Sequence, residues 1–100
     1  MIYNKLVRDR IPEIIAAKGQ ISKTHIADEK EYWEKLKEKL GEETQEFLKD
    51  ENIEELADLM EVVEVIKKFK NFDSQKLENI RLEKLAKRGG FEKRIIFEES

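Results

Sequence analysis

Two helix-start signals, 24 residues apart, most constrain what this chain can fold into. Asp28 is followed three positions later by Glu31, and Asn52 is followed three positions later by Glu55. A capping side chain with an acid three residues on is the pattern that opens many α-helices. The sequence therefore predicts two long helices joined by a tight turn into a hairpin, over residues 28–49 and 52–70.

Shorter elements are predicted on both sides of this hairpin. A short helix is expected to begin near Asp9, whose side chain can cap it, and to end at Gly19. A third long helix is expected over residues 73–88, before Gly89. Two stretches rich in β-branched and aromatic residues predict short strands, which we expect to pair because isolated strands are marginal; they are residues 20–27 and 91–98.

The composition fits this helical plan. One hundred residues make one domain, spanning 1–100, with a thin core. Hydrophobic residues are 39% and charged residues 43% of the chain, a ratio that suits helices with one buried face each. We therefore predict a mainly all-α fold, a bundle built on a long antiparallel hairpin with flanking helices and a small two-stranded accessory.

Charge and cysteine content exclude several kinds of protein. The net charge of −3 combines 20 basic and 23 acidic residues, whereas binding a nucleic acid polymer needs a basic excess. The chain has no cysteine, so it has neither disulfides nor thiolate metal sites. No apolar run approaches the ~20 residues that span a membrane, and residues 1–10 lack an apolar signal core. We expect a soluble, cytoplasmic protein without a membrane partner.

Acidic residues interrupt the apolar stripes of both long helices. In the first helix Glu43 falls between Leu40 and Phe47 on the apolar face, when positions are counted by three and four. In the second helix the stripe that includes Val62 continues upstream at Asp58. Each helix thus places an acid where its period requires a core residue, and such mismatches are expected at functional sites.

The hairpin brings a second pair of acids to the same place. Positions equidistant from the turn face each other, so Glu46 opposes Glu55 as Glu43 opposes Asp58. Four converging carboxylates repel one another unless they stay in water or share a cation. Oxygen ligands without imidazole or thiolate favour Mg²⁺, with Mn²⁺ as a substitute. The alternative interpretation is a solvated acidic helix face.

These acids lie in motifs that resemble a known family. Residues 41–46 (Gly-Glu-Glu-Thr-Gln-Glu) and 54–58 (Glu-Glu-Leu-Ala-Asp) resemble the EExxE…ExxD signature of the MazG-like, all-α nucleotide pyrophosphohydrolase superfamily. The opening residues 3–12 and the closing residues 87–91 look like its phosphoribosyl-ATP pyrophosphohydrolase-like branch. The resemblance covers nearly the whole chain. Its one departure is the connection between the two acidic motifs, which is short.

The resemblance implies a reaction and a site. The reaction is hydrolysis of the α–β phosphoanhydride of a nucleotide, which gives a monophosphate and pyrophosphate. The acids that match the family's Mg²⁺ ligands are Glu43, Glu46, Glu55 and Asp58, and we expect Glu43 or Glu46 to activate the attacking water. Two alternatives stay open: a histidine-biosynthesis enzyme acting on phosphoribosyl-ATP, and a non-catalytic helical interaction module.

The resemblance also implies a homo-oligomer, either a dimer or a tetramer, with its sites against a subunit contact. The apolar stripes point the same way, because positions such as Met60 and Val63 add more apolar surface than one hairpin covers.

Basic side chains are candidates for binding the substrate's phosphates. Arg81, Lys84 and Arg88 recur at spacings of three and four, which makes one basic stripe on the last helix. A solvated face offset by nearby glutamates explains that stripe equally well. A second basic group near the start of the chain has a salt-bridged surface as its default interpretation; it comprises Lys5, Arg8 and Arg10.

Overall fold

The computed structural model describes residues 3–100 and shows an all-helical protein. In chain order the helices are α1 (Ile11–Ala17), α2 (Glu29–Asp50), α3 (Ile53–Phe69) and α4 (Ser74–Arg88). The predicted all-α class is confirmed. None of the helices within residues 3–100 has the length and apolarity needed to cross a membrane.

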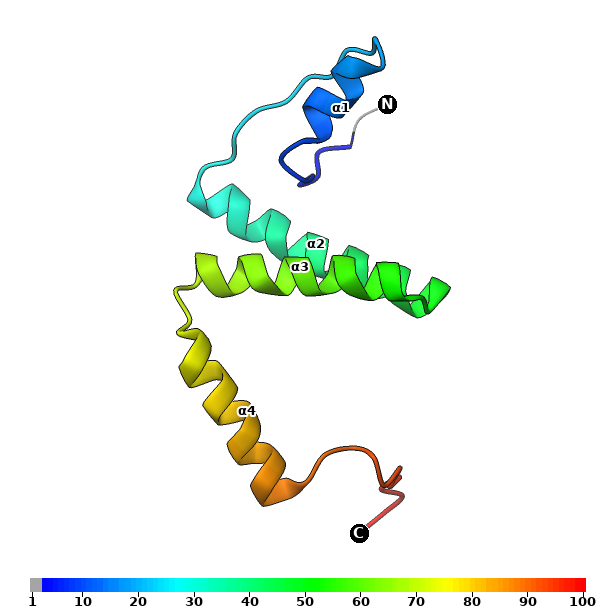
Figure 1. The fold of residues 1–100 in the computed structure, drawn as a ribbon, viewed down its shortest axis with the longest axis vertical. Helices are drawn as coiled ribbons and strands as arrows, with labels where there is room; N and C mark the ends of the chain where they lie inside the picture. Colours follow the sequence, from blue (N-terminus) through cyan, green and yellow to red (C-terminus); the bar gives the residue numbers. More distant parts are fainter. Residues whose placement is uncertain (1–2) are drawn as a thin grey trace.

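The predicted hairpin is formed by α2 and α3, which lie antiparallel and side by side (Figure 1). The Asp28 carboxylate accepts a 2.8 Å hydrogen bond from the backbone N–H of Glu31. The Asn52 side chain accepts a 2.9 Å bond from the N–H of Glu55. Both helix-start predictions are thus confirmed. Glu51 closes the turn in the left-handed conformation, with φ of 52°.

A narrow core runs between the two long helices. Leu36 of α2 is 1% exposed and Val62 of α3 is 8% exposed. At the open end of the hairpin Trp33 stacks on Phe69 with ring centroids 5.6 Å apart, and Tyr32 meets Phe69 edge-on at 5.3 Å. These contacts hold the open end together by apolar packing, while the end near the turn carries the acidic residues.

The last helix leads away from the hairpin (Figure 1). Within the part of the chain described, α2 and α3 are the one pair of helices that pack along their length. The radius of gyration is 18.0 Å, whereas a compact chain of this length has about 13 Å. Asp73 caps α4 by accepting bonds from the N–H groups of Gln75 and Lys76, and Gly89 ends it with φ of 80°, as predicted.

The predicted pair of strands is wrong. No strand occurs anywhere between residues 3 and 100, and both stretches are irregular. Ile21 and Ile26 are 100% and 96% exposed, while Ile95 and Phe97 are each about 80% exposed. The reason is topological, because α4 carries the tail away from the segment before α2 (Figure 1), so neither stretch has a ladder partner.

The start of the first helix also differs from the prediction. The N-cap position of α1 is occupied by Arg10, which makes no side-chain cap bond. Asp9 lies one residue too early and belongs to a turn that the N–H of Ile11 closes on the carbonyl of Arg8, at 3.1 Å. The predicted stop is confirmed, because Gly19 follows α1 with φ of 75°.

Candidate functional site

Glu43 is buried on the apolar face of α2, as its position in the stripe predicts. The residue is 7% exposed, less than many of the protein's apolar residues. Its Oε1 lies 3.5 Å from Nζ of Lys39, one turn earlier. Its Oε2 is inaccessible to water and accepts no hydrogen bond within the described residues. A buried carboxylate oxygen without a hydrogen-bond partner is costly to the fold.

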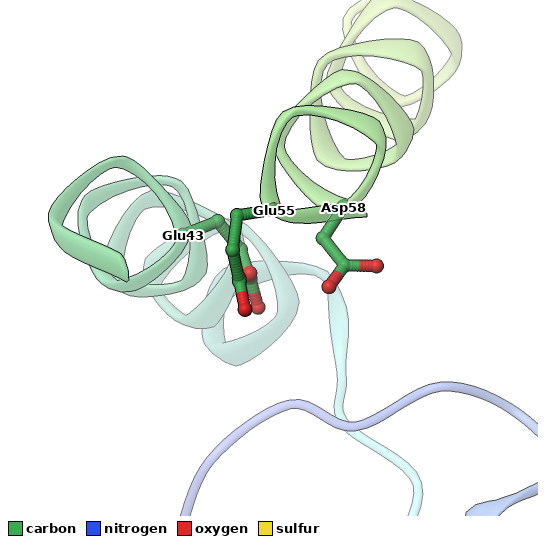
Figure 2. A group of neighbouring side chains, drawn as sticks. All are labelled: Glu43, Glu55 and Asp58. Atoms are coloured by element: carbon green, nitrogen blue, oxygen red, sulfur yellow. The ribbon is translucent and has the colours of Figure 1, made fainter. Parts of the chain in front are cut away.

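Two acids from the start of α3 lie beside it. One carboxylate oxygen each of Glu43, Glu55 and Asp58 lies within 4.8 Å of the other two. Figure 2 shows these side chains, one from α2 and two from α3, directed into a common space. Glu55 repeats the unusual feature of Glu43, because its Oε2 is also inaccessible and unpartnered. We call these three residues the acidic cluster.

The fourth predicted ligand lies next to the acidic cluster. Glu46 is exposed and lies outside the group of three. The pKa of Glu55 is raised, first by burial of its carboxyl group and then by the negative charges of Glu46 and Asp58. Glu46 is therefore near enough to act on Glu55. The structure brings three of the four predicted acids together and places the fourth beside them.

The donor set suits a hard divalent cation. Every candidate ligand atom is a carboxylate oxygen, which Mg²⁺ and Mn²⁺ prefer. Ligand oxygens at about 2.1 Å from one Mg²⁺ lie roughly 3–4 Å from one another. The separations in the acidic cluster, up to 4.8 Å, are wider than this range, so the three carboxylates would have to draw closer together to share one ion.

Two basic side chains of the N-terminal segment form ion pairs with acids of the hairpin. Nζ of Lys5 lies 2.9 Å from Oε1 of Glu42, and the pKa of Glu42 is lowered mainly by this hydrogen bond. The same bond raises the pKa of Lys5. Nη2 of Arg8 lies 2.7 Å from Oδ1 of Asp58. Two of the three basic residues near the start of the chain therefore contact the acidic region, whereas Arg10 pairs with Glu13 within α1.

A hollow of about 240 Å³ adjoins the acidic cluster, between the N-terminal segment and the hairpin. Its walls include Glu43 and Asp58, and the N-terminal segment passes on the side toward which the carboxylates point (Figure 2). Lys39 and Glu61 also line it, and the sequence analysis did not single them out. Their spacing was the available signal, because Lys39 lies four residues before Glu43 and Glu61 lies three after Asp58.

The predicted phosphate-binding stripe lies elsewhere in the chain. Arg81 donates a 3.1 Å hydrogen bond from Nε to Glu78, which lowers the pKa of that glutamate. Lys84 and Arg88 line a surface depression on α4 itself. Because α4 leads away from the hairpin, one chain does not bring these three side chains to the acidic cluster (Figure 1).

Comparison with known proteins adds no relative. The chain matches no family model, no curated protein and no solved structure. The likeness to the MazG-like superfamily therefore stays a prediction from the motifs.

Proposed function

We propose that this protein is a metal-dependent nucleotide pyrophosphohydrolase, which cleaves the α–β phosphoanhydride of a nucleoside triphosphate or a related nucleotide. One observation carries the proposal. Glu43 and Glu55 each bury a carboxylate oxygen that has no hydrogen-bond partner among residues 3–100, and both belong to the acidic cluster with Asp58. A solvated helix face leaves such atoms in water, whereas a bound divalent cation would supply the partner that they lack.

The residues divide into metal ligands and a base. Glu43, Glu55 and Asp58 hold the cation, which when bound neutralises phosphate charge and makes a bound water more acidic. Glu46 is exposed and outside the cluster, so its carboxylate is available to take the proton of the attacking water. The water oxygen bonds to the α phosphorus and stays in the monophosphate. The bond between the α phosphorus and the α–β bridging oxygen breaks, and pyrophosphate leaves with the bridging oxygen.

The proposal includes a homo-oligomer. Leu56, Met60 and Val63 form an i, i+4, i+7 stripe on α3 and are 40%, 60% and 42% exposed. Exposed leucines on α4, such as Leu82 and Leu85, add a second apolar surface. A second copy of the chain would cover both surfaces. In that assembly, α4 of the second copy supplies Lys84, Arg88 and Arg81 to the phosphates.

The proposed setting is the cytoplasm, where a chain without cysteine needs no oxidising compartment. Two other candidates differ in what they predict. A histidine-biosynthesis enzyme would use phosphoribosyl-ATP in preference to ordinary triphosphates. A non-catalytic interaction module would neither bind Mg²⁺ at the acidic cluster nor turn over any nucleotide.

The test is a screen of canonical and modified triphosphates, with phosphoribosyl-ATP included, in the presence of Mg²⁺ or Mn²⁺. Release of pyrophosphate is measured, and the reaction is repeated in ¹⁸O-labelled water. We expect the label in the monophosphate, because the water attacks the α phosphorus. Label in the pyrophosphate would mean attack at the β phosphorus and a different enzyme.

Two variants make the screen specific to the acidic cluster. Asp58→Asn keeps nearly the same shape but is a poor Mg²⁺ ligand, so we expect it to abolish turnover. Glu64→Gln is the control, because Glu64 lies on α3 in an exposed ion pair with Lys67. No turnover above the Asp58→Asn background across the panel would reject the enzyme in favour of the interaction module.

A further inference from the structure

The N-terminal segment, residues 3–10, is tied to the hairpin through acidic residues. Lys5 bonds to Glu42 on α2, 37 positions away, and Arg8 bonds to Asp58 on α3, 50 positions away. Both pairs join an irregular segment to well-formed helices. The segment therefore lies across the face that holds the acidic cluster, where Leu6, Val7 and Arg8 line the adjoining hollow.

The hollow between this segment and the hairpin has a size that limits what it accepts. Its volume is about 240 Å³, below the roughly 300–1,000 Å³ of pockets that enclose a whole small ligand. It can take only one part of a nucleotide, with the remainder outside. Its wall holds two cations, Arg8 and Lys39, and four acids, Asp9, Glu43, Asp58 and Glu61, so a phosphate group enters it only once a bound cation offsets the acids.

The ion pair between Arg8 and Asp58 is easily broken. The two side chains are 59% and 43% exposed, and exposed pairs of this kind add little to stability. The guanidinium is always charged, and its planar donors match a phosphate in two parallel hydrogen bonds. Arg8 can therefore exchange Asp58 for a phosphate at small cost.

We infer that Arg8 has two successive partners: Asp58 in the metal-free protein, and a phosphate group of the substrate once a divalent cation occupies the acidic cluster. The inference rests on the proposed function, since it assigns Arg8 to the same site. A cation on Asp58 supplies the positive charge that Arg8 provides in its absence. Arg8 then faces the hollow beside a cation that attracts phosphate.

This exchange predicts effects of opposite sign for two ligands. Arg8 competes with the metal for Asp58 and repels it, so loss of Arg8 strengthens metal binding. Arg8 attracts phosphate, so loss of Arg8 weakens phosphate binding. A residue that only holds the segment in place would weaken both or change neither.

The experiment compares Arg8→Gln with Arg10→Gln, since Arg10 lies on the same segment but pairs with Glu13 and does not line the hollow. Binding of Mn²⁺ is measured by electron paramagnetic resonance, and binding of pyrophosphate in saturating Mg²⁺ by calorimetry. For Arg8→Gln we expect the Mn²⁺ Kd to fall about three- to tenfold. We expect its pyrophosphate Kd to rise about 10- to 100-fold, while Arg10→Gln changes neither.

A second substitution guards against misfolding. Arg8→Lys keeps the charge but loses the paired donors, so Mn²⁺ binding should stay near wild type while pyrophosphate binding weakens. Circular dichroism shows whether each variant is folded. If Arg8→Gln does not fold, pyrophosphate binding to Arg8→Lys tests the inference instead. Unchanged pyrophosphate affinity in the folded variant, or weaker binding of both ligands, would overturn the inference and leave the proposed function standing. Absence of Mn²⁺ binding to the wild type would overturn both.

Discussion

A carboxylate oxygen of Glu43 on α2 lies within 4.8 Å of a carboxylate oxygen of Glu55 on α3, and each residue buries an Oε2 atom that accepts no hydrogen bond from the part of the chain described. Nζ of Lys39 lies 3.5 Å from Oε1 of Glu43, and the pKa of Lys5 is raised mainly by its hydrogen bond to Glu42 and less by the charge of Glu43. Two helices that pack in this register bring like charges together at their interface. The arrangement favours any ligand that supplies positive charge between them.

Mg²⁺ should therefore stabilise the fold. A ligand at about 100 times its Kd adds about 2.7 kcal/mol to the free energy of unfolding when it binds only the native state. Thermal unfolding with and without Mg²⁺ measures this. The double variant Glu43→Gln, Asp58→Asn should lose the response, and an equal response in wild type and variant would rule out the acidic cluster as the binding site. Ca²⁺ serves as a comparison, because it accepts longer metal–oxygen distances than Mg²⁺ does.

The raised pKa of Glu55 predicts how the metal-free protein responds to pH. Burial is the main cause, followed by the charge of Glu46. A carboxyl group whose pKa is higher in the folded state binds its proton more tightly there. Its charge therefore destabilises the fold as the pH rises from the ordinary value of 4.5 through the raised value.

The measurement is the free energy of unfolding against pH, without metal, for wild type and Glu55→Gln. Above pH 4.5 the wild type should lose stability with rising pH relative to the variant, and saturating Mg²⁺ should remove the difference. The effect of Glu42 on stability has the opposite dependence on pH. Because Lys5 lowers the pKa of Glu42, the charged Glu42 stabilises the fold, and this stability is lost as the pH falls below 4.5. Parallel curves for wild type and Glu55→Gln would contradict the assigned role of Glu55.

The turn of the hairpin stores strain at Glu51. This residue has φ of 52°, a left-handed conformation that costs a side-chain-bearing residue about 1 kcal/mol or more. Glu51→Gly should stabilise the protein by about 1 kcal/mol, measured by urea unfolding. Glu51→Gln separates the causes, because it removes the charge but keeps the strain. If both variants stabilise equally, the gain comes from charge and not from the backbone.

Local patterns predict this fold where the determining contacts are local. The caps at Asp28, Asn52 and Asp73 form bonds to backbone groups two or three residues ahead, so each signal is complete within one turn of sequence. The burial of Glu43 follows from helical period in the same way. The two strands were wrong because β-propensity describes one segment, whereas a strand also needs a partner.

Contacts between the hairpin and the segments outside it could not be predicted. Arg8 and Asp58 are 50 positions apart, and no periodicity connects an irregular segment to a helix. The direction of α4 could not be predicted either, because the helical period identifies its apolar and basic positions but not what covers them. For this reason Arg81, Lys84 and Arg88 could be placed on one stripe, while their separation from the acidic cluster emerged only from the structure.

The proposed homo-oligomer gives the last prediction. If α4 of one copy supplies basic side chains to the acidic cluster of another copy, two inactive variants should restore activity when they assemble together. One variant carries a substitution in the acidic cluster, and the other carries substitutions in the basic stripe on α4. Asp58→Asn and the double variant Lys84→Glu, Arg88→Glu should each be inactive alone. Mixed and reassembled in equal amounts as dimers, they should recover roughly a quarter of wild-type activity, since half the dimers are mixed and each of these has one intact site.

Two controls make the complementation decisive. Sedimentation equilibrium should show an oligomer at micromolar concentration for the wild type, and Met60→Glu should shift it toward monomer, because Met60 is 60% exposed at the centre of the stripe on α3. Mixing Asp58→Asn with Glu43→Gln should recover nothing, because both changes lie in the same acidic cluster. If the stripe variant keeps full activity by itself, Lys84 and Arg88 do not bind substrate. If all the variants assemble but no mixture recovers activity, each site is complete within a single chain.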